Sequence, residues 1–290
     1  MPQTINTNLI SLNAQRNLAT SQGSLAVSMQ RLSSGLRVNS AKDDAAGLAI
    51  AERMNTQARG MSVAMRNAND GISMAQVGEG ALGKVGDILQ RMRELAVQAS
   101  NGTNSPEDRD SLNQEYVQLA QEATRTLGGT QFNGNNILAS TAAFEFQIGA
   151  NNTTNLDRLT VDAFNWVGVT AINSLLGSAV LTGTAAPVPQ IAGTNGTAAQ
   201  SALGLIDTAI NAINSQRATL GAVQNRFDSV IANLMVNTEN QLAARGRIMD
   251  ADYAAETANL SRAQILQQAG NAMVAQANQL PQQVLSLLQR

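Results

Sequence analysis

Apolar residues recur every three or four positions from Ser40 to Ser100, a stretch that contains no proline. The apolar seam consists of Ile50, Met54, Met61, Met65, Ala68, Ile72, Ala75, Leu82, Leu89, Met92 and Leu95. This period predicts one long helix that is buried along one side. At ~1.5 Å per residue an unbroken helix would be ~90 Å long, so it needs other long helices beside it. The sequence leaves open whether the helix is kinked near Gly71, since glycine costs about 1 kcal/mol relative to alanine inside a helix.

Four other stretches show the same helical spacing of apolar residues. The first runs from Ile5 to Leu36, and the second begins at Ser105-Pro106, an N-cap candidate followed by proline at the first helical position. The third begins at Ser201 with a near-heptad seam and is the partner that the long helix requires; a possible joint follows at Arg245–Arg247. A last series runs from Leu260 to the C-terminus. The turn formers Ser33–Ser40 separate the first two predicted helices, with Asn39 or Ser40 as a cap.

The two terminal helices share an unusual lack of charge. No acidic residue occurs before Asp43 or after Glu256, and polar positions are mostly Asn, Gln, Ser and Thr. Helices of this kind are expected to be covered on several sides, so we expect the chain to self-associate, and a contact that does not close a ring produces a filament. The residues expected to mediate this polymerisation are Leu9, Leu12, Leu32, Leu36, Leu266, Met273, Val284 and Leu287.

The middle of the chain follows another pattern. Strict alternation at Phe144–Ile148, a turn-like Asn/Thr run and Leu159–Val161 together predict a β-hairpin. Residues 163–200 are rich in Ala, Gly, Thr and Asn and contain two prolines, which predicts a loop-rich insertion. The expected fold is mainly α: a long antiparallel, coiled-coil-like helical bundle formed from both chain ends, with a small hairpin region and a short loop-rich central insertion.

The composition argues against catalysis, disulfide bonds and metal binding. The chain of 290 residues contains no His and no Cys, so the commonest metal ligand, the usual general base and any disulfide or thiolate are missing. Two close carboxylate pairs, Asp43 with Asp44 and Asp250 with Asp252, are better explained by capping than by cation binding. We expect no enzyme activity, no cofactor and no metal. A net charge of −2 gives no reason to expect nucleic acid as a partner, and neither a signal peptide nor a membrane-inserted segment is predicted.

Several ordered blocks at both ends of the chain closely resemble bacterial flagellin, the subunit of the flagellar filament. The blocks are Ile5–Asn8, Arg31–Gly47 (RLSSGLRVNSAKDDAAG), Leu89–Gln98 (LQRMRELAVQ), Gln224–Phe227 (QNRF), Asp250–Ala254 (DADYA) and Gln264–Gly270 (QILQQAG). The resemblance covers roughly residues 1–160 and 201–290. It implies a structural subunit that polymerises for swimming motility.

The resemblance also implies a domain arrangement and a set of partners. Residues 1–38 with 255–290 would form an inner domain in the filament core, residues 39–162 with 201–254 a surrounding long-helix domain, and residues 163–200 a short outer insertion. The chain would leave the cell through the flagellar type III export apparatus without a cleaved signal and reside in the extracellular flagellum. Its partners would be itself, an export chaperone, and the cap and hook-junction proteins.

Recognition by the innate receptor TLR5 of hosts is a further implication of the resemblance. The matching residues are Gln90, Arg91, Glu94, Leu95, Gln98 and Glu115. Arg91, Leu95 and Gln98 share one helix face by their spacing, and Glu115 could lie beside it on the next helix. A simple subunit contact, with Arg91 paired to Glu115 and Leu95 packed, is the alternative for this patch. For the whole chain, a hook–filament junction protein or a coiled-coil adhesion protein remains the alternative.

Overall fold

The chain forms long helices and two short antiparallel hairpins, of which the sequence predicted the longer one. The computed structural model describes residues 7–153, 156–162, 164–176 and 190–288, without the side chains of residues 167, 171 and 280–288. Two compact units are present: residues 1–57 with 239–290, and residues 58–238. Helices α2 (Ala45–Ala99) and α5 (Thr197–Met249) each contribute one part to either unit. The prediction of a mainly helical fold built from both chain ends is therefore confirmed.

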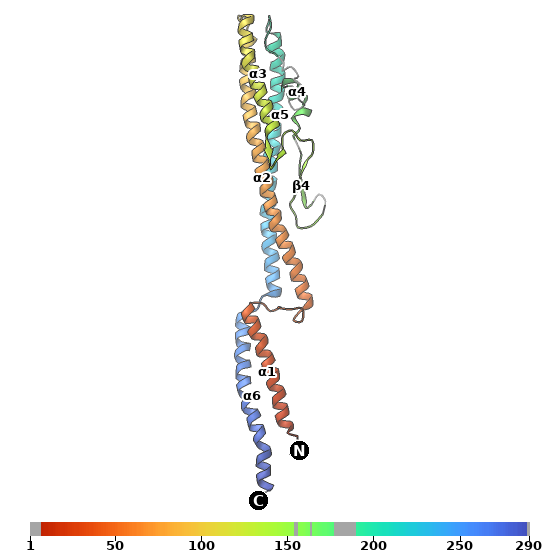
Figure 1. Ribbon diagram of the computed structural model, residues 1–290, viewed down its shortest axis with the longest axis vertical. Coiled ribbons are helices and arrows are strands. Elements are labelled where there is room, and N and C mark those ends of the chain that lie inside the picture. Colours follow the sequence, from red (N-terminus) through yellow and green to blue (C-terminus); the bar gives the residue numbers. More distant parts are fainter. Residues whose placement is uncertain (1–6, 154–155, 163, 177–189, 289–290) are drawn as a thin grey trace. The chain divides into compact units, whose positions relative to one another are not determined.

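In the first unit, α1 (Leu9–Ser34) and α6 (Tyr253–Leu288) lie side by side and antiparallel (Figure 1). Asn8 caps α1, because its Oδ1 accepts a hydrogen bond from the backbone N of Ser11 at 3.1 Å. The Nδ2 of Asn8 donates to the carbonyl of Ala277 at 2.7 Å, and Ser11 Oγ donates to Asn278 Oδ1 at 2.7 Å. Ser11 and Ser28 are buried, so the two backbones approach closely over small side chains.

The connections α1–α2 and α5–α6 are joined by backbone hydrogen bonds within the same unit. α1 ends at Gly35, whose φ of 71° is left-handed. Arg37 N donates to the carbonyl of Met249 at 2.6 Å, and Ala251 N donates to the carbonyl of Gly35 at 3.0 Å. The joint after α5 thus lies at residues 250–252, a few residues beyond the expected Arg245–Arg247.

The expected cap of α2 was wrong. Neither Asn39 nor Ser40 caps the helix; Asp44 does, since its Oδ1 accepts a hydrogen bond from Gly47 N at 2.7 Å. Asn39 and Ser40 instead donate their backbone N–H groups to the carboxylate of Asp43, at 3.1 and 2.9 Å. These bonds close a turn, which delays the start of α2 to Ala45. From there α2 continues without interruption through Gly71 to Ala99.

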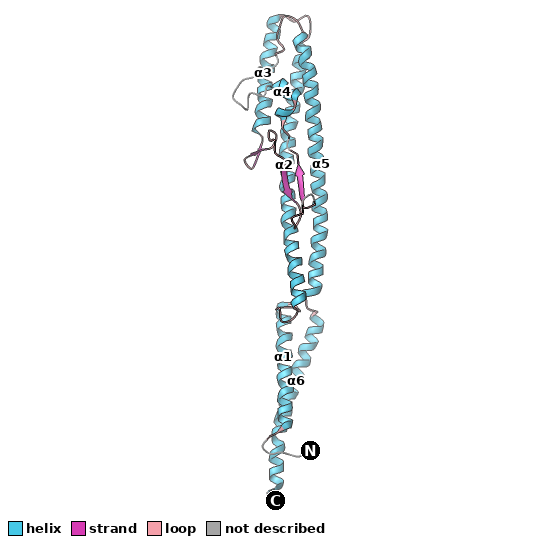
Figure 2. Cartoon of the chain, turned by 90° about the vertical axis from the view of Figure 1, so that its right-hand side faces the viewer, coloured by secondary structure: helices cyan, strands magenta, loops and turns pink. Residues whose placement is uncertain are grey.

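In the second unit, α3 (Pro106–Gly129) folds back antiparallel beside α2, with α5 alongside (Figure 2). The predicted start of α3 is confirmed. Ser105 Oγ accepts from Asp108 N at 3.1 Å and Ser105 N donates to Asp108 Oδ2 at 3.0 Å, which is a capping box with Pro106 at the first position.

Two hairpins follow α3 (Figure 2). β1 (Gln131–Phe132) and β2 (Asn135–Asn136) are joined by the turn Asn133-Gly134, in which both residues have positive φ. The hairpin predicted from alternation is present as β3 (Phe144–Gln147) and β4 (Arg158–Val161), with Phe144 opposite Val161.

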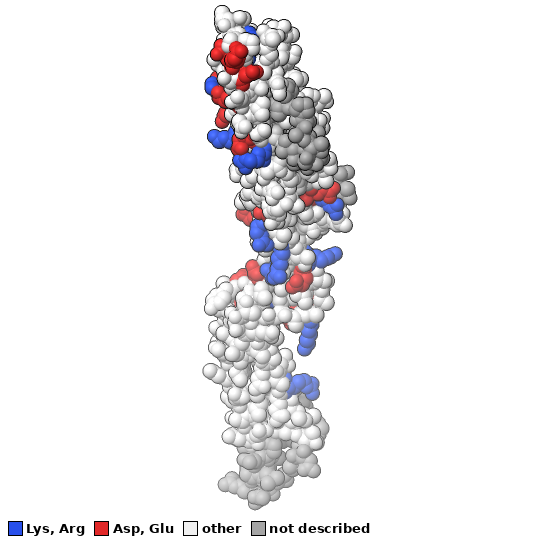
Figure 3. Space-filling view, turned by 45° about the horizontal axis from the view of Figure 1, so that its top comes forward, with Lys and Arg blue, Asp and Glu red and all other residues white. Residues whose placement is uncertain are grey.

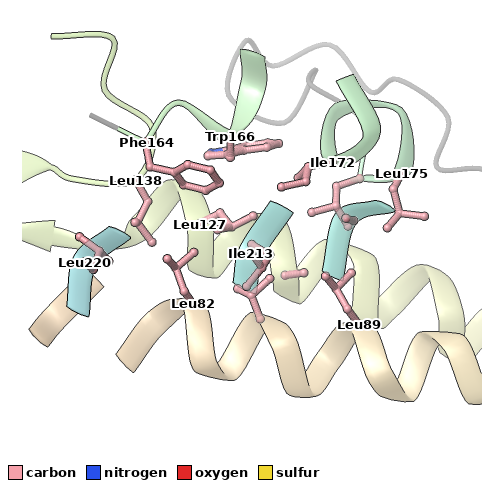
Figure 4. Close-up of a cluster of buried hydrophobic side chains, with 14 of the residues drawn as sticks. Leu82, Leu89, Leu127, Leu138, Phe164, Trp166, Ile172, Leu175, Ile213 and Leu220 are labelled. Carbon is pink, nitrogen blue, oxygen red and sulfur yellow. The ribbon is translucent and has the colours of Figure 1, made fainter. Parts of the chain in front are cut away.

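The core of the second unit contains side chains from the segment that was expected to be a loop-rich insertion. After β4 the chain forms the 3-10 helix η1 (Trp166–Gly168) and α4 (Thr170–Leu176). Trp166, Ile172 and Leu175 are buried among the leucines of α2 and α3 (Figure 4). α5 also begins at Thr197, earlier than expected. Periodicity missed this contribution because a helix of seven residues is too short for the helical spacing to repeat.

Candidate functional site

The first candidate surface is an exposed set of apolar side chains on α1 and α6, which we name the terminal-helix face. It comprises Leu9, Ile10, Leu12, Val27 and Met29 on α1 and Ile265, Leu266 and Met273 on α6. Leu9 is 68% and Ile265 66% exposed. Only Arg16, Arg31, Glu256 and Arg262 are charged in the described parts of these helices. On the face drawn in Figure 3, the surface of this helix pair is almost free of charged side chains. Exposed apolar surface of this kind is typical of an interaction site.

The predicted polymerisation residues divide into three groups. Leu9, Leu12, Leu266 and Met273 are exposed and belong to the terminal-helix face. Leu32 and Leu36 are half-buried, and Leu36 packs against the small cluster of Val38, Ala51 and Met249. The side chains of Val284 and Leu287 lie outside the described residues.

Sequence reasoning missed Ile10, Val27 and Ile265 because it assumed one apolar stripe on each terminal helix. The structure shows that α1 uses a different stripe for α6, with buried Ser11 and Ser28 and half-buried Leu18 and Leu25. A serine is not counted as apolar, so the covered stripe could not be recognised from hydrophobicity. The apolar residues off this stripe are therefore the exposed ones.

The second candidate surface is a group of charged side chains shared by α2 and α3. Arg91 Nε donates to Glu115 Oε1 at 2.9 Å, and Arg91 Nη1 donates to Glu94 Oε2 at 2.9 Å. Hydrogen bonds to Glu94 and Glu115 raise the pKa of Arg91 above its usual value. All three side chains are about half exposed or more, so the ion pairs contribute little to stability. The structure thus brings together three of the predicted receptor-binding residues.

Leu95 differs from the expectation for a receptor contact, but it is packed as in the alternative. It is only 1% exposed and belongs to the core of the second unit, so it offers no apolar side chain on the surface. Arg91 and Leu95 are four positions apart and therefore lie on one side of α2. Leu95 nevertheless faces the core, whereas Arg91 is exposed. Gln90 and Gln98 are exposed, as predicted for surface contacts.

Two features beside this group were not predicted. Arg93 Nε donates to Asp207 Oδ1 of α5 at 2.7 Å, and a shallow hollow is lined by Gln90, Arg93, Glu94, Val97 and Gln98. Val97 is 49% exposed. Asp207 is 114 residues from Arg93 in the sequence, so no local pattern could have paired them.

The close carboxylate pairs have structural roles. Asp43 accepts hydrogen bonds from the backbone N of Asn39 and of Ser40 and from Ser40 Oγ, which lower the pKa of Asp43. Asp252 caps α6 by accepting from the backbone N of Ala254 and Ala255, at 2.9 and 3.1 Å. In the described part of the chain, no group of three acidic residues could hold a metal ion. None of the described helices combines the length and apolar character needed to cross a membrane.

Comparison with known proteins agrees with these features. Residues 5–143 match the bacterial flagellin N-terminal helical region, and residues 203–288 match the bacterial flagellin C-terminal helical region. A flagellin of Halalkalibacterium halodurans is 45% identical over 287 residues, covering 98% of this chain and 99% of the relative. Flagellin A of Vibrio cholerae is 37% identical, covering 98% of this chain and 99% of the relative.

Among solved structures, a putative flagellar hook-associated protein from Vibrio parahaemolyticus has a TM-score of 0.57 at 12% identity. The match covers 72% of this chain and all of that chain, and at this identity it supports the fold alone. The two helical-region matches together span most of the sequence, and the relatives match over nearly its whole length. The chain therefore belongs to the bacterial flagellin family.

Proposed function

We propose that this chain polymerises into the flagellar filament and thereby serves swimming motility. The observation that carries the proposal is the terminal-helix face, a set of exposed apolar side chains on a helix pair with almost no charge. Flagellins are structural filament proteins, so the chain is not an enzyme, as its composition predicted.

Removal of the terminal-helix face from water is the physical reason for assembly. Each Å² of apolar surface buried contributes roughly 25 cal/mol, so several leucine and isoleucine side chains per subunit supply a strong driving force. Neighbouring copies can bury these residues with little electrostatic repulsion, because the polar positions of both helices are mostly uncharged. A charge introduced there would have to be buried without a partner, which is strongly unfavourable.

Substitution of exposed leucines tests this function. Leu12→Asp and Leu266→Asp should prevent filament formation, as followed by sedimentation and electron microscopy. Asn214→Asp adds the same charge at an exposed position of α5 and serves as the control, which should assemble normally. Filaments formed by both leucine variants would contradict the proposal. Discrete oligomers of the unaltered chain in place of long filaments would favour a junction or adhesion protein.

We infer the domain roles and the export route from family membership. α1 and α6 would form the filament core, the long helices with the hairpins would surround it, and residues 163–200 would lie outermost. Export would use the flagellar type III apparatus and a chaperone, with the cap and hook-junction proteins as further partners, and would place the chain in the extracellular flagellum. Loss of the extracellular protein in cells that lack this apparatus is the expected result.

We also propose that the innate receptor TLR5 contacts the charged group at Arg91. The planar guanidinium of Arg91 is held by Glu94 and Glu115, and the hollow with exposed Val97 lies beside it. Charged groups fixed in place around an apolar contact are typical of interface hot spots. In this arrangement the buried Leu95 supports the receptor contact indirectly, because it keeps α2 and α3 packed.

Receptor signalling by the monomer separates these roles. Arg91→Ala should reduce signalling at least tenfold without unfolding the protein, since one hot-spot truncation often costs ~2 kcal/mol. Leu95→Ala should reduce signalling only as far as it reduces the thermal stability of the second unit. Arg125→Ala removes a similar exposed pair with Glu122 and is the matched control. Undiminished signalling by Arg91→Ala would rule out Arg91 as a receptor contact.

A further inference from the structure

The tripeptide Asn-Gly-Thr occurs twice in the chain, at residues 101–103 and 195–197, and both of its asparagines are exposed. Arg109 joins the two segments, because its guanidinium donates to the carbonyl of Asn101 at 3.0 Å and to the carbonyl of Thr194 at 3.3 Å. An asparagine that precedes glycine can react with its own backbone, since glycine has no Cβ to hinder ring closure. The two copies share one local sequence, so a difference in their reactivity must come from the structure.

We propose that Asn101 is a site of spontaneous deamidation, whereas the fold protects Asn195 in the same tripeptide. This modification goes beyond the proposed function and does not depend on assembly. In the reaction, the backbone N of Gly102 loses its proton to hydroxide and attacks Cγ of Asn101. The new C–N bond closes a succinimide ring, the bond from Cγ to Nδ2 breaks, and the leaving nitrogen takes up a proton to depart as ammonia. Water then opens one of the two ring carbonyls, which leaves aspartate or isoaspartate at position 101.

The side chain of Asn101 is already turned toward the backbone that must attack it. Its Oδ1 accepts a hydrogen bond from Thr103 N at 3.4 Å, a local contact that brings the carboxamide toward the intervening peptide bond. The same N–H donates to the oxygen on which negative charge develops during the attack, as in an oxyanion hole. Gly102 is exposed, and its N–H donates to no described residue, so it is open to deprotonation. This geometry favours ring closure.

Asn195 is held in a different geometry. No equivalent contact joins Thr197 N to the Asn195 side chain in the described part of the chain. Gly196 packs closely on the turn after α2, because a Cβ placed on it would be 2.6 Å from the carbonyl oxygen of Ser100. The carbonyl of Gly196 also accepts a hydrogen bond from Gln200 N at 3.0 Å, in the first turn of α5. Ring closure at Asn195 must disturb these contacts, which raises its barrier and slows the reaction.

Arg109 determines what the modification does to the fold. It is 3% exposed, and its acceptors among the described residues are all carbonyl oxygens. The carbonyl of Asn101 is one of them, and it becomes a carboxylate when the succinimide opens to isoaspartate. A hydrogen bond between two charged groups is roughly twice as strong as one between neutral groups. The guanidinium therefore keeps a partner at this position, and the end of the second unit should stay closed after deamidation.

The unaltered chain tests the inference with its own internal control. Peptide mass spectrometry of protein incubated at neutral pH, with isoaspartyl methyltransferase labelling, gives the deamidation rate at each asparagine. In the folded chain Asn101 should react at least about tenfold faster than Asn195. In urea the two should react at similar rates, because their tripeptides are identical. Equal rates in the folded chain, or a faster reaction at Asn195, would overturn the inference.

Two matched proline variants test the contact with Oδ1. Thr103→Pro removes the donating N–H, so the rate at Asn101, taken relative to the same variant in urea, should fall by about tenfold. Thr197→Pro makes the same change at the first position of α5, where proline is tolerated, and should leave the corresponding ratio at Asn195 unchanged. An undiminished ratio in Thr103→Pro would contradict the proposed role of this N–H.

Hydrogen exchange of the deamidated protein tests the role of Arg109. Protein that carries isoaspartate at position 101 is separated from the unreacted chain by ion exchange, since it has one more negative charge. Amide exchange in the turn between α2 and α3 should be as slow in this protein as in the unreacted chain. Faster exchange there would show that Arg109 does not hold the product.

Discussion

Gly71 of α2 lies directly against the ring of Phe227 of α5. A Cβ placed on Gly71 would be 2.5 Å from Cζ of Phe227, so only glycine leaves room for the ring. The same ring meets Phe146 of β3 edge-on, with centroids 5.4 Å apart and planes at 84°. Gly71 therefore lies within a continuous helix, where its lack of a side chain makes room for Phe227. This contact accounts for a glycine that was a candidate kink in the sequence.

This contact predicts opposite effects for two similar substitutions in α2. Gly71→Ala should destabilise the second unit by about 1–3 kcal/mol through overpacking, although alanine is the better helix former. Gly80→Ala, where no atom lies within 4 Å of the added Cβ, should stabilise it by up to about 1 kcal/mol. Urea unfolding of both variants measures the difference. Equal stability of the two would contradict the contact with Phe227.

Leu175 of α4 should behave as a core residue. It is fully buried, so Leu175→Ala should cost about 2–5 kcal/mol in the free energy of unfolding. Leu156→Ala is the control, because Leu156 is 78% exposed and its loss should change stability by less than about 0.5 kcal/mol. Thermal unfolding followed by circular dichroism compares them. Tolerance of both substitutions would indicate that residues 163–200 are indeed only a peripheral insertion.

Arg109 should be essential to one end of the second unit. It is 3% exposed, and its guanidinium donates to the carbonyls of Ala99 at 2.9 Å, Asn101 at 3.0 Å and Thr194 at 3.3 Å. Arg109→Met leaves these carbonyls without their donor and should cost about 2–4 kcal/mol. Hydrogen exchange should accelerate in the α2–α3 turn and near Thr194.

The exposed pair of Arg125 with Glu122 provides the control for Arg109. Arg125→Met should cost less than about 1 kcal/mol and leave hydrogen exchange in the α2–α3 turn unchanged. If Arg109→Met had an effect equally small, the buried hydrogen bonds would not be the cause of order at this end.

Acid should weaken two turns of the chain. Backbone hydrogen bonds, from Asn39 and Ser40 in one case and from Ser105 in the other, lower the pKa of Asp43 and of Asp108 below its usual value. A carboxyl whose folded pKa is depressed contributes stability above its unfolded value of about 3.9, and this stability is lost as pH falls through the folded pKa.

Substitution with asparagine isolates this pH dependence. Asp43→Asn and Asp108→Asn should lower stability at neutral pH and flatten its fall below about pH 4, where the carboxylates protonate. Asp110→Asn, at an exposed position of α3, is the control and should retain the slope of the unaltered chain. Unfolding measured between pH 2 and 7 gives the slopes. Identical slopes for all variants would exclude a role for these hydrogen bonds.

The terminal helices should gain protection on assembly. The described parts of α1 and α6 leave many of their large apolar side chains exposed, and burial must offset the ordering entropy. The expected change concerns residues 1 to about 38 and about 255 to 290. Limited proteolysis should therefore remove these residues from the monomer and spare them in the filament. Equal resistance in both states would show that α1 and α6 are stable without neighbouring copies.

The sequence by itself determined the helices, the start of α3 and the longer hairpin. Apolar spacing of three and four identified α1, α2, α3, α5 and α6, and Ser105-Pro106 marked the start of α3 to the residue. Alternation identified β3 and β4. The pair Asn133-Gly134 is also the usual sequence signal of a two-residue hairpin and coincides with the turn between β1 and β2. These signals are local, since each depends on residues a few positions apart.

Only the tertiary structure decided which faces are covered. Leu95 and Arg91 share a side of α2, yet one is buried and the other exposed. The stripe of α1 that packs on α6 contains the serines Ser11 and Ser28 as well as leucines. Arg93 pairs with Asp207, and Gly71 accommodates Phe227, over separations beyond the reach of any local pattern. Periodicity indicates that a helix has a buried side. Which neighbour covers that side is set by long-range packing, and this packing decides which side chains stay exposed and free to bind.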